Sequence, residues 1–432
     1  MRSEQILKVT HVGNYWNRGG AATAMVRVHE AIQSASNGEE VASRIQVALS
    51  ERQYSEAEDS STLATAPKSI GRRLDSRVRK TLGRRISVAT GSVVSIPPSF
   101  PTGLGALLNK QPIDIVNLHW LGGATLSLRE LRRLQKPVVW RLPDLWPAGS
   151  VEHYPSLALV ESGYRHNELG LPADVFLALK WFWKQKARHL DFPFLAVCPS
   201  EWTREFAERS PLFRNVDCEV IPNPLDTDFW KPDPYDRLVL PQRRDEGSRL
   251  RLLFGAAGGT QDPRKGWAFF RVALERLAAE SPGVSISIEV FGERRQDENL
   301  HGFPIKFLGP LDSVGLRNAY RRADLFVATP SQESFGQTVT EAQSCGTAVL
   351  GTKVGGLRDN IECGVSGYLV DPGDVRQLSN WLLHFAGSLR DARVLGINAR
   401  QRAVRLWSYG VVGRQYIELY KEIVQTKRKT QR

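Results

Sequence analysis

Glu333 and Glu341 are eight residues apart, and they lie in the part of the sequence that is most informative about a binding site. The stretch, ADLFVATPSQESFGQTVTEAQSCGTAVLGTKVGG, reads as an apolar run, a polar loop and a helix that begins near Phe335 or Gly336. Backbone N–H groups at a helix start attract phosphate, and glycine lets a ligand approach closely. The pattern therefore favours a phosphate site, although two such glutamates also occur as ordinary solvated charges.

Glu341 falls about one and a half turns into this predicted helix. Because helical side chains lean back toward the N-terminus, its carboxylate could accept hydrogen bonds from a ribose beside the phosphates.

Repeated strand-like runs, each followed by a loop and a helical pattern, must position these residues. In the second half of the chain the runs are LRLLFGA, SISIEVFG, IKFLGP, LFVATPS and TAVLGT, and in the first half they are ILKVTHVG, DIVNLHW, PVVWRL and FLAVCPS. Such alternation predicts parallel sheets covered by helices. Open sheets of this kind bind ligands beyond the carboxyl ends of their strands, which is where Glu333 falls.

The two series predict two doubly wound domains. At 432 residues the chain exceeds one ordinary core, and a segment dense in proline and charge, VIPNPLDTDFWKPDPYDRLVLPQRRDEG, separates the series. We therefore predict an N-terminal domain over 1–225 and a C-terminal domain over 226–405. A final helix over 406–432, with a frayed basic tail, should pack back toward the first domain.

Composition places the chain among soluble globular proteins, with 41% apolar and 24% charged residues. The four cysteines show no metal-ligand spacing and fit a reducing compartment. Because the sequence shows neither an apolar run of about 18 residues nor a signal-peptide pattern, we predict a cytoplasmic protein. The formal net charge of +12 predicts an anionic partner: a nucleotide, a nucleic acid or a membrane surface.

A basic insertion at about residues 66–90 contributes strongly to this charge. Residues 68–86, KSIGRRLDSRVRKTLGRRI, carry eight Lys and Arg residues against one acid. A helix here would place its apolar residues along one side, with basic residues around them. Three interpretations stay open: a solvated helix packed by its apolar stripe, a helix on an anionic membrane, and a nucleic-acid contact. The apolar residues, four positions apart, are Ile70, Leu74, Val78, Leu82 and Ile86.

The residues around the two glutamates resemble a known signature. Glu333, seven residues and Glu341, framed by P-S-x-x-E-S-F-G and E-A-x-x-x-G-x-x-V, are similar to the donor site of the retaining glycosyltransferases of family four. That family has the α/β fold called GT-B, in which two Rossmann-like domains with parallel sheets face each other across a cleft. The resemblance implies that the first glutamate meets the donor sugar, the Phe-Gly amides the diphosphate, and the second glutamate the ribose. The implied donor residues are Glu333, Ser334, Phe335, Gly336, Gln337 and Glu341.

Other parts of the family pattern follow in the same order along the chain. GGTQDPRKGW resembles the loop in which a lysine neutralises the donor diphosphate, a role that falls to Lys265. Gly259 and Thr260 replace the arginine that the family usually has shortly before this lysine, so Arg264 is our candidate to take its place. Ala348 stands where the family commonly has proline.

In the first half of the chain, NRGGAATA places Gly19 and Gly20 at the turn after the first strand. The family's backbone amides could meet the diphosphate there, although a glycine pair is also a common structural turn. His119 matches the second histidine of the family's His-x-His pattern, with Asn117 in place of the first. The resemblance implies that His119 contacts a sugar, whereas a lone histidine at a strand end is usually just packed.

The segment WRLPDLWPAGSVEHY resembles one in the subgroup that builds bacterial capsular and colanic-type exopolysaccharides. Aromatic faces and carboxylates suit sugars, which present both C–H faces and hydroxyl groups. Pro143 replaces the histidine usual before the aspartate, and the alternative is that the tryptophans are core residues and the aspartate caps a turn. The implied acceptor residues are Asp144, Trp146, Glu152, His153 and Tyr154.

The reaction that the resemblance implies is a transfer of a hexose, with retention at the anomeric carbon, from a UDP- or GDP-sugar to a saccharide. Its candidate catalytic residues are Lys265, Glu333 and His119. We expect no metal or other cofactor, because no Asp-x-Asp at a strand end resembles the cation motif of the other main glycosyltransferase fold.

The basic insertion and the subgroup resemblance favour a lipid-linked acceptor at the inner membrane face, contacted through residues 68–86. The alternatives are a sugar-nucleotide epimerase of the same fold, a non-catalytic scaffold, and a nucleic-acid-binding basic protein, for which the sequence shows no binding motif.

Overall fold

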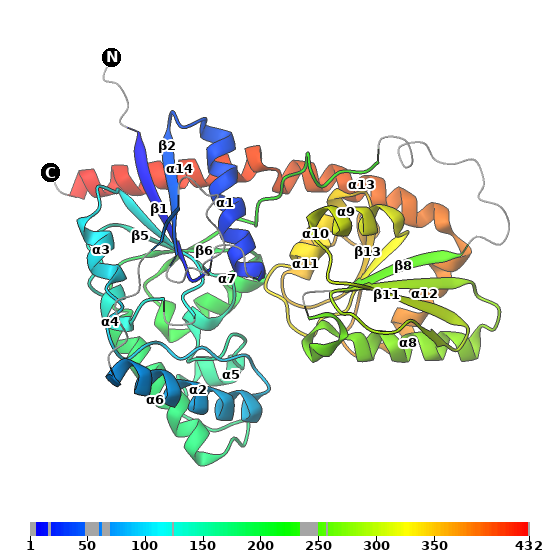
Figure 1. The fold of residues 1–432 in the computed structure, drawn as a ribbon, viewed down its shortest axis with the longest axis horizontal. Coiled ribbons are helices and arrows are strands. Elements are labelled where there is room, and N and C mark those ends of the chain that lie inside the picture. The colour runs from blue at the N-terminus through cyan, green and yellow to red at the C-terminus, as the bar shows by residue number, and fades with distance from the viewer. Residues whose placement is uncertain are drawn as a thin grey trace. The chain divides into compact units, whose positions relative to one another are not determined.

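The computed structural model describes residues 6–15, 19–47, 60–62, 70–122, 125–233, 249–255 and 258–430, so residues 66–69 of the predicted insertion lie outside it. The chain divides into two compact units (Figure 1). Unit 1 contains the residues up to Pro224 together with the C-terminal helix from Tyr409, and unit 2 runs from Leu225 to Ser408. Within the described residues, each unit is built on a seven-stranded sheet.

The sheet of unit 1 is parallel, with the strand order β3-β2-β1-β4-β5-β6-β7. The four runs predicted in the first half form β1, β4, β5 and β6, which confirms the predicted parallel sheet. Every side chain of β4 and β5 is buried, as expected for strands with helices on both faces. The strands are β1 Leu7–Gly13, β2 Val41–Val47, β3 Ser60–Thr62, β4 Ile115–Leu118, β5 Val138–Arg141, β6 Leu195–Cys198 and β7 Asp217–Val220.

Helices α1 and α14 pack against each other on one face of this sheet, where Val28, Ile32, Tyr416 and Ile417 meet strand residues (Figure 1). A second apolar core around Trp140 lies on the other face, under helices that include α3, α4, α6 and α7. The helices are α1 Gly20–Ser36, α2 Ile70–Thr90, α3 Leu104–Lys110, α4 Leu128–Leu131, α5 Leu157–Glu161, α6 Ala173–His189, α7 Glu201–Glu208 and α14 Tyr409–Thr430, with 3-10 turns η1 Trp146–Ala148 and η2 Pro211–Phe213.

The C-terminal tail differs from its prediction. Helix α14 continues through Thr430, so the prediction of a frayed tail is wrong up to that residue, and residues 431–432 lie outside the described part. The packing of α14 against α1 supports this helix, and each residue added to a formed helix gains a backbone hydrogen bond.

Unit 2 repeats the same plan with the strand order β10-β11-β9-β8-β12-β13-β14, parallel except for the pair β10 and β11. The five predicted runs form β8, β9, β11, β12 and β13. The strands are β8 Leu250–Gly255, β9 Ile286–Phe291, β10 Glu298–Leu300, β11 Phe303–Gly309, β12 Leu325–Ala328, β13 Ala348–Thr352 and β14 Gly367–Val370.

Helices cover both faces of this sheet too. Helices α8 and α12 pack on one apolar core, and α9, α10 and α13 pack on another. The helices are α8 Trp267–Glu280, α9 Ser313–Arg322, α10 Gln337–Ser344, α11 Leu357–Asn360, α12 Val375–Gly387 and α13 Leu389–Trp407, with 3-10 turns η3 Gly259–Gln261 and η4 Pro263–Lys265.

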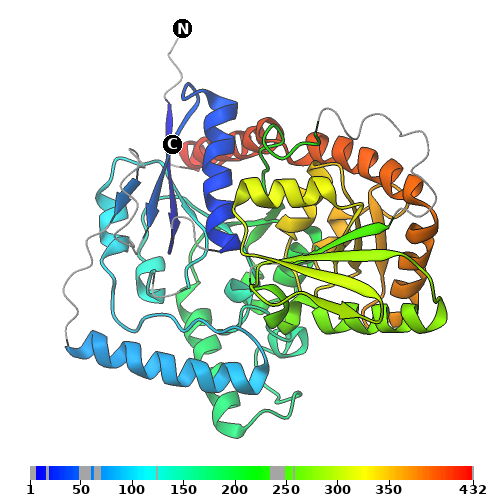
Figure 2. The same ribbon diagram turned by 45° about the vertical axis from the view of Figure 1, so that its right-hand side comes forward.

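Helix α2 lies along one end of unit 1 (Figure 2) and corrects the predicted apolar stripe. Leu82 and Ile86 pack on the core, but Leu74 and Val78 are 62% and 56% exposed. A spacing of four residues advances by about 40° at each step around a helix of 3.6 residues per turn, so these residues wind around α2 instead of lining one side. No described helix is long and apolar enough to span a membrane.

Candidate functional site

The loop between β12 and α10 forms one part of the candidate donor site in unit 2. Helix α10 starts at Gln337, close to the predicted start, and Gly336 is its N-cap with φ +90°, a conformation that glycine adopts without strain. Phe335 is 3% exposed and packs on the ring of Trp407, so this residue has only its backbone to offer a ligand. Ser334 is buried beside it. The first N–H groups of α10 can therefore serve an anion, as predicted for a helix start.

Lys265 and Glu333 meet at the carboxyl ends of β8 and β12. The Nζ of Lys265 lies 2.8 Å from Oε2 of Glu333, and both side chains are partly exposed. They line one pocket together with Gly255, Thr329 and Gly336. Two residues 68 positions apart thus place opposite charges beside the start of α10, where a phosphate group could take the place of the carboxylate on the ammonium.

The turn at Gly266 allows this approach. A Cβ at residue 266 would lie 1.7 Å from the carbonyl oxygen of Thr329, and φ of Gly266 is +78°. Only glycine fits between η4 and β12 at this point, so it holds Lys265 against the loop that carries Glu333.

Glu341 is 5% exposed and lies inside unit 2 on α10. Its Oε2 is 3.4 Å from the hydroxyl of Tyr320, which is fully buried on α9. Glu341 is therefore not one of the solvated helix charges that the sequence left open. A buried carboxylate is costly unless it accepts hydrogen bonds, which suits a residue that binds hydroxyl groups.

Arg264 is already engaged. Its Nη2 lies 2.6 Å from Oδ2 of Asp262, and its Nε donates to Oδ1 of the same carboxylate at 3.1 Å. Burial alone would raise the pKa of Asp262, but the hydrogen bonds and charge of Arg264 outweigh it and lower that pKa. Asp262 thus neutralises the charge of Arg264, the residue that the sequence analysis proposed in place of the family's arginine.

The neighbouring loop is held by Glu293, which the sequence analysis did not single out. Its carboxylate accepts hydrogen bonds from the backbone N–H of Thr260 and from the side chain of Gln261, at 3.0 and 2.8 Å. These bonds lower the pKa of Glu293. An acid thus lies beside Gly259 and Thr260, where the family has its arginine.

The predicted glycine turn of unit 1 is present at the start of α1. Gly19 is the N-cap residue with φ +83°, and both Gly19 and Gly20 are exposed, while residues 16–18 lie outside the described part. This arrangement is compatible with an anion contact and equally with a simple turn.

His119 follows β4 and is 1% exposed. Its Nε2 lies 3.0 Å from Nδ1 of His11 on β1, a partner that the sequence analysis missed. Burial lowers the pKa of both rings well below 6.5, so both are neutral at pH 7. Asn117 donates to the hydroxyl of Tyr420 on α14, at 2.6 Å. The structure therefore places His119 in a buried polar cluster and shows no sugar-facing surface on it.

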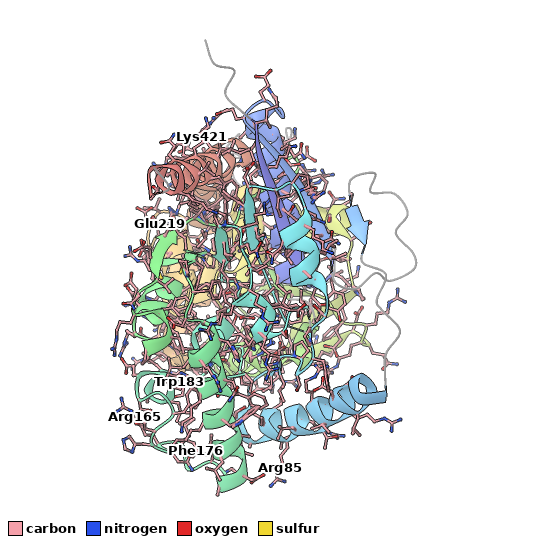
Figure 3. All side chains as sticks on the ribbon, turned by 90° about the vertical axis from the view of Figure 1, so that its left-hand side faces the viewer. Arg85, Arg165, Phe176, Trp183, Glu219 and Lys421 are labelled. Carbon is pink, nitrogen blue, oxygen red and sulfur yellow. The ribbon has the colours of Figure 1, made fainter. Side chains whose placement is uncertain are left out.

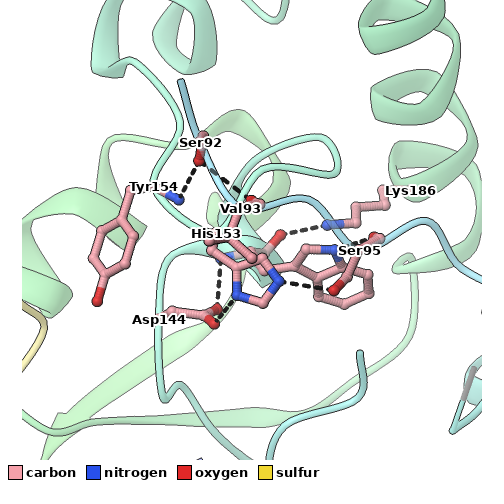
Figure 4. A network of polar contacts seen from close by, with 8 residues as sticks. Ser92, Val93, Ser95, Asp144, His153, Tyr154 and Lys186 are labelled. Carbon is pink, nitrogen blue, oxygen red and sulfur yellow. Dashed lines mark hydrogen bonds and ion pairs between the residues drawn. The ribbon is translucent and has the colours of Figure 1, made fainter. Parts of the chain in front are cut away.

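The predicted acceptor segment centres on an aspartate and a histidine (Figure 4). Oδ2 of Asp144 lies 2.6 Å from Nδ1 of His153, and Nε2 of His153 lies 2.8 Å from the hydroxyl of Ser95. Asp144 also accepts from the backbone N–H of Trp146 at 3.0 Å, so it caps the turn as the alternative interpretation held. The carboxylate fixes which nitrogen of His153 carries the proton and leaves Nε2 as an acceptor for a hydroxyl. Tyr154 beside it is half-buried.

Trp146 and Glu152 belong to the packing beneath this segment. Trp146 is 4% exposed, and its ring lies 3.5 Å from the ammonium of Lys186, which donates to the carbonyl oxygens of Trp146 and Gly149. The hydroxyl of Tyr164 donates to Glu152. Burial raises the pKa of Glu152 and lowers that of Lys186 well below its usual value. Trp146, Glu152 and Lys186 are thus buried beneath the turn and support it by packing and hydrogen bonds.

Replacing Lys186 by methionine should destabilise unit 1 by about 2–4 kcal/mol, because the carbonyl oxygens of Trp146 and Gly149 each lose one donor. Lys184 on the same helix is exposed, and its replacement by methionine should change stability by less than about 0.5 kcal/mol. Chemical denaturation of both variants measures the difference. Equal stabilities would show that the turn does not depend on the buried ammonium.

Among the described residues, no group of three His, Cys, Asp or Glu side chains is placed to hold a metal ion.

Part of unit 2 is similar to a known protein family. Residues 251–387 match the family model described as glycosyl transferases group 1. Unit 2 carries a group 1 glycosyl transferase domain. This domain includes Lys265, Glu333 and Glu341.

Two curated relatives extend the match beyond this glycosyl transferase domain. A phosphatidyl-myo-inositol mannosyltransferase of Mycobacterium tuberculosis (strain ATCC 25618 / H37Rv) is 30% identical over 229 residues, which are 50% of this chain and 57% of the relative. The chain thus spans little more than half the length of that relative. A D-inositol 3-phosphate glycosyltransferase of Corynebacterium glutamicum (strain R) is 26% identical over 377 residues, covering 81% of this chain and 84% of the relative.

Solved structures show that the fold is GT-B. A sucrose-phosphate synthase from Thermosynechococcus elongatus matches 97% of this chain and 100% of its own, with a TM-score of 0.65 and 17% identity. The Anabaena protein HepE, solved with UDP-glucose, matches 96% of this chain and 100% of its own, with a TM-score of 0.58 and 15% identity.

Proposed function

We propose that this chain is a retaining, metal-independent glycosyltransferase that moves a hexose from a nucleotide diphosphate sugar to a saccharide. The observation that carries the proposal is the Lys265–Glu333 pair, at 2.8 Å, in a pocket that also reaches Gly336 at the start of α10. A compact cation beside the backbone N–H groups of a helix start suits a diphosphate. The named transferases among the relatives support the reaction class, and the UDP-glucose bound to HepE supports the donor class.

The donor residues then have distinct tasks. Charge develops on the diphosphate as its bond to the sugar breaks, so Lys265 and the first amides of α10, including that of Gln337, would stabilise the transition state electrostatically. Glu333 would contact the sugar, and buried Glu341 would bind the ribose hydroxyls. UDP and GDP are the proposed nucleotides.

The acceptor is assigned to unit 1. Asp144, His153 and Tyr154 are the proposed contacts. Asp144 orients the ring of His153, whose Nε2 lies 2.8 Å from the hydroxyl of Ser95, and a sugar hydroxyl would take the place of Ser95 there. Trp146 and Glu152 would support this segment from within. We propose a lipid-linked saccharide of bacterial polysaccharide synthesis as acceptor, on the cytoplasmic face of the membrane.

Binding of UDP-, GDP- and ADP-glucose tests the donor site. Since a ligand that binds only the folded state stabilises it, one nucleotide class should raise the melting temperature of the wild type. Glu341→Ala should lose this shift, whereas Glu362→Ala, an exposed glutamate in the same unit, should keep it. A thermal-shift titration measures all three proteins.

No shift with any nucleotide sugar would contradict the proposal. Conversion of the donor sugar without an acceptor would instead identify an epimerase of the same fold.

A further inference from the structure

The exposed face of α2 is both basic and apolar. Around the described part of the helix, Leu74 and Val78 stand among Arg77, Lys80 and Arg84, all of them exposed. Side chains of this size are rarely left in water without a partner when they gather on one face. The face is unlike the polar outer face of an ordinary solvated helix.

Helix α6 carries a second stripe of the same character. Leu177 and Trp181 are 61% and 55% exposed, and Lys184 and Arg188 continue their row at helical spacing. The sequence analysis did not identify this helix as a candidate surface. Trp181 is a large side chain to leave in water, and tryptophan, like tyrosine, is enriched at membrane–water interfaces.

The two helices adjoin. Arg85 of α2 forms an ion pair with Asp174 in the first turn of α6, and the two helices contact each other. Figure 3 shows Arg85 and Phe176 at this junction. We therefore define the two-helix surface by the following exposed basic and apolar residues of the two helices: Leu74, Arg77, Val78, Lys80 and Arg84 on α2, and Leu177, Trp181, Lys184 and Arg188 on α6.

The charges of this surface are unbalanced. Each helix has a single acid, and each acid is already paired: Asp75 with Arg79 on the same helix, and Asp174 with Arg85. The remaining arginines and lysines of the surface therefore face solvent as an excess of positive charge, which attracts an anionic partner.

We propose that the two-helix surface docks on an anionic phospholipid bilayer. Basic side chains meet lipid headgroups, while Leu74, Val78, Leu177 and Trp181 enter the boundary between headgroups and acyl chains. A nucleic acid would use the cations but would leave these apolar side chains in water. The combination on both helices favours a bilayer.

Docking of the two-helix surface on a bilayer would bring the bilayer close to the proposed acceptor segment. This step rests on the proposed function. The chain leaves α2 at Thr90 and pairs at once with the acceptor segment: Ser95 N–H donates to the carbonyl of Val151, and His153 N–H donates to that of Val93. The helix on the bilayer and the histidine of the acceptor segment are thus joined within a few residues. A lipid-linked saccharide would be presented close to His153.

Flotation of the full-length protein with phosphatidylcholine vesicles, with and without phosphatidylglycerol, tests the surface. The wild type should bind only when the anionic lipid is present. Arg77→Glu with Arg84→Glu should weaken binding by tenfold or more, and Leu177→Ser with Trp181→Ser by about tenfold. The control is Arg390→Glu with Arg405→Glu, which makes the same change of net charge on exposed residues of unit 2 and should bind as the wild type does.

Melting curves and the UDP- or GDP-sugar shift, measured on each variant, separate a misfolded protein or a failed donor site from a failed docking surface. Equal binding by the wild type and by Arg77→Glu with Arg84→Glu would overturn the proposal. So would equal binding to vesicles without anionic lipid. Binding of an oligonucleotide that depends on the arginines and ignores Leu177 and Trp181, without vesicle binding, would replace the bilayer by a nucleic acid.

Discussion

Lys265→Ala should lower turnover of the nucleotide-sugar donor by about 10²- to 10³-fold while leaving the fold intact. Removal of one preorganised group that stabilises developing charge typically has an effect of about this size. The ammonium of Lys265 is 2.8 Å from Glu333 in a pocket beside the start of α10, so its loss removes positive charge where the diphosphate would leave. The side chain is 26% exposed, so stability should change little. Steady-state kinetics with saturating acceptor measure the effect.

Arg264→Ala is the matched control. Because its guanidinium is already paired with Asp262, we expect a loss of no more than about tenfold. If both variants lost activity equally, the two cations would act together and the assignment of Lys265 as the principal phosphate group would be wrong. If Lys265→Ala kept full activity, the proposed donor site would fail.

Local patterns predicted the strands that matter for the donor site. The runs ending before Lys265 and Glu333 form β8 and β12 as predicted, because a buried parallel strand needs a short, continuous apolar run. Strand β14, Gly367–Val370, was missed because four residues next to a glycine-rich turn carry little pattern. The winding of apolar residues around α2 also differs from the predicted stripe, because a repeat of four residues drifts around a helix of 3.6 residues per turn.

Partners far apart in sequence escaped the sequence analysis. Lys186 lies 40 residues from Trp146, and Ser95 lies 58 residues from His153. Nothing in the sequence indicates that Lys186 or Ser95 has a buried partner, because a lysine within a helix is normally solvated and a serine in a loop is normally exposed. Only the folded chain shows that one ammonium is buried under a tryptophan and that one hydroxyl meets an oriented imidazole.

The position of Glu333 also depends on a glycine, Gly355, in the turn after β13. The backbone N–H of Gly356 donates to the carbonyl oxygen of Glu333 at 2.9 Å, which ties the two loops together. Gly355 has φ +49°, and a Cβ there would lie 1.8 Å from the same carbonyl oxygen. Because the obstacle is backbone, no side-chain rotation can relieve it, and the loop carrying Glu333 has to move.

Gly355→Ala should therefore lower donor turnover to about the level of Lys265→Ala and destabilise unit 2 by about 2–4 kcal/mol, from strain and displacement together. Gly373→Ala is the control: φ is +84°, but a Cβ there meets nothing within 4 Å, so only a conformational cost of about 1–2 kcal/mol is expected, with normal turnover. Denaturation curves and donor kinetics on both variants separate the two effects. Normal turnover by Gly355→Ala would mean that the loop yields without moving the Glu333 carboxylate from Lys265, and that the pair is not fixed by this contact.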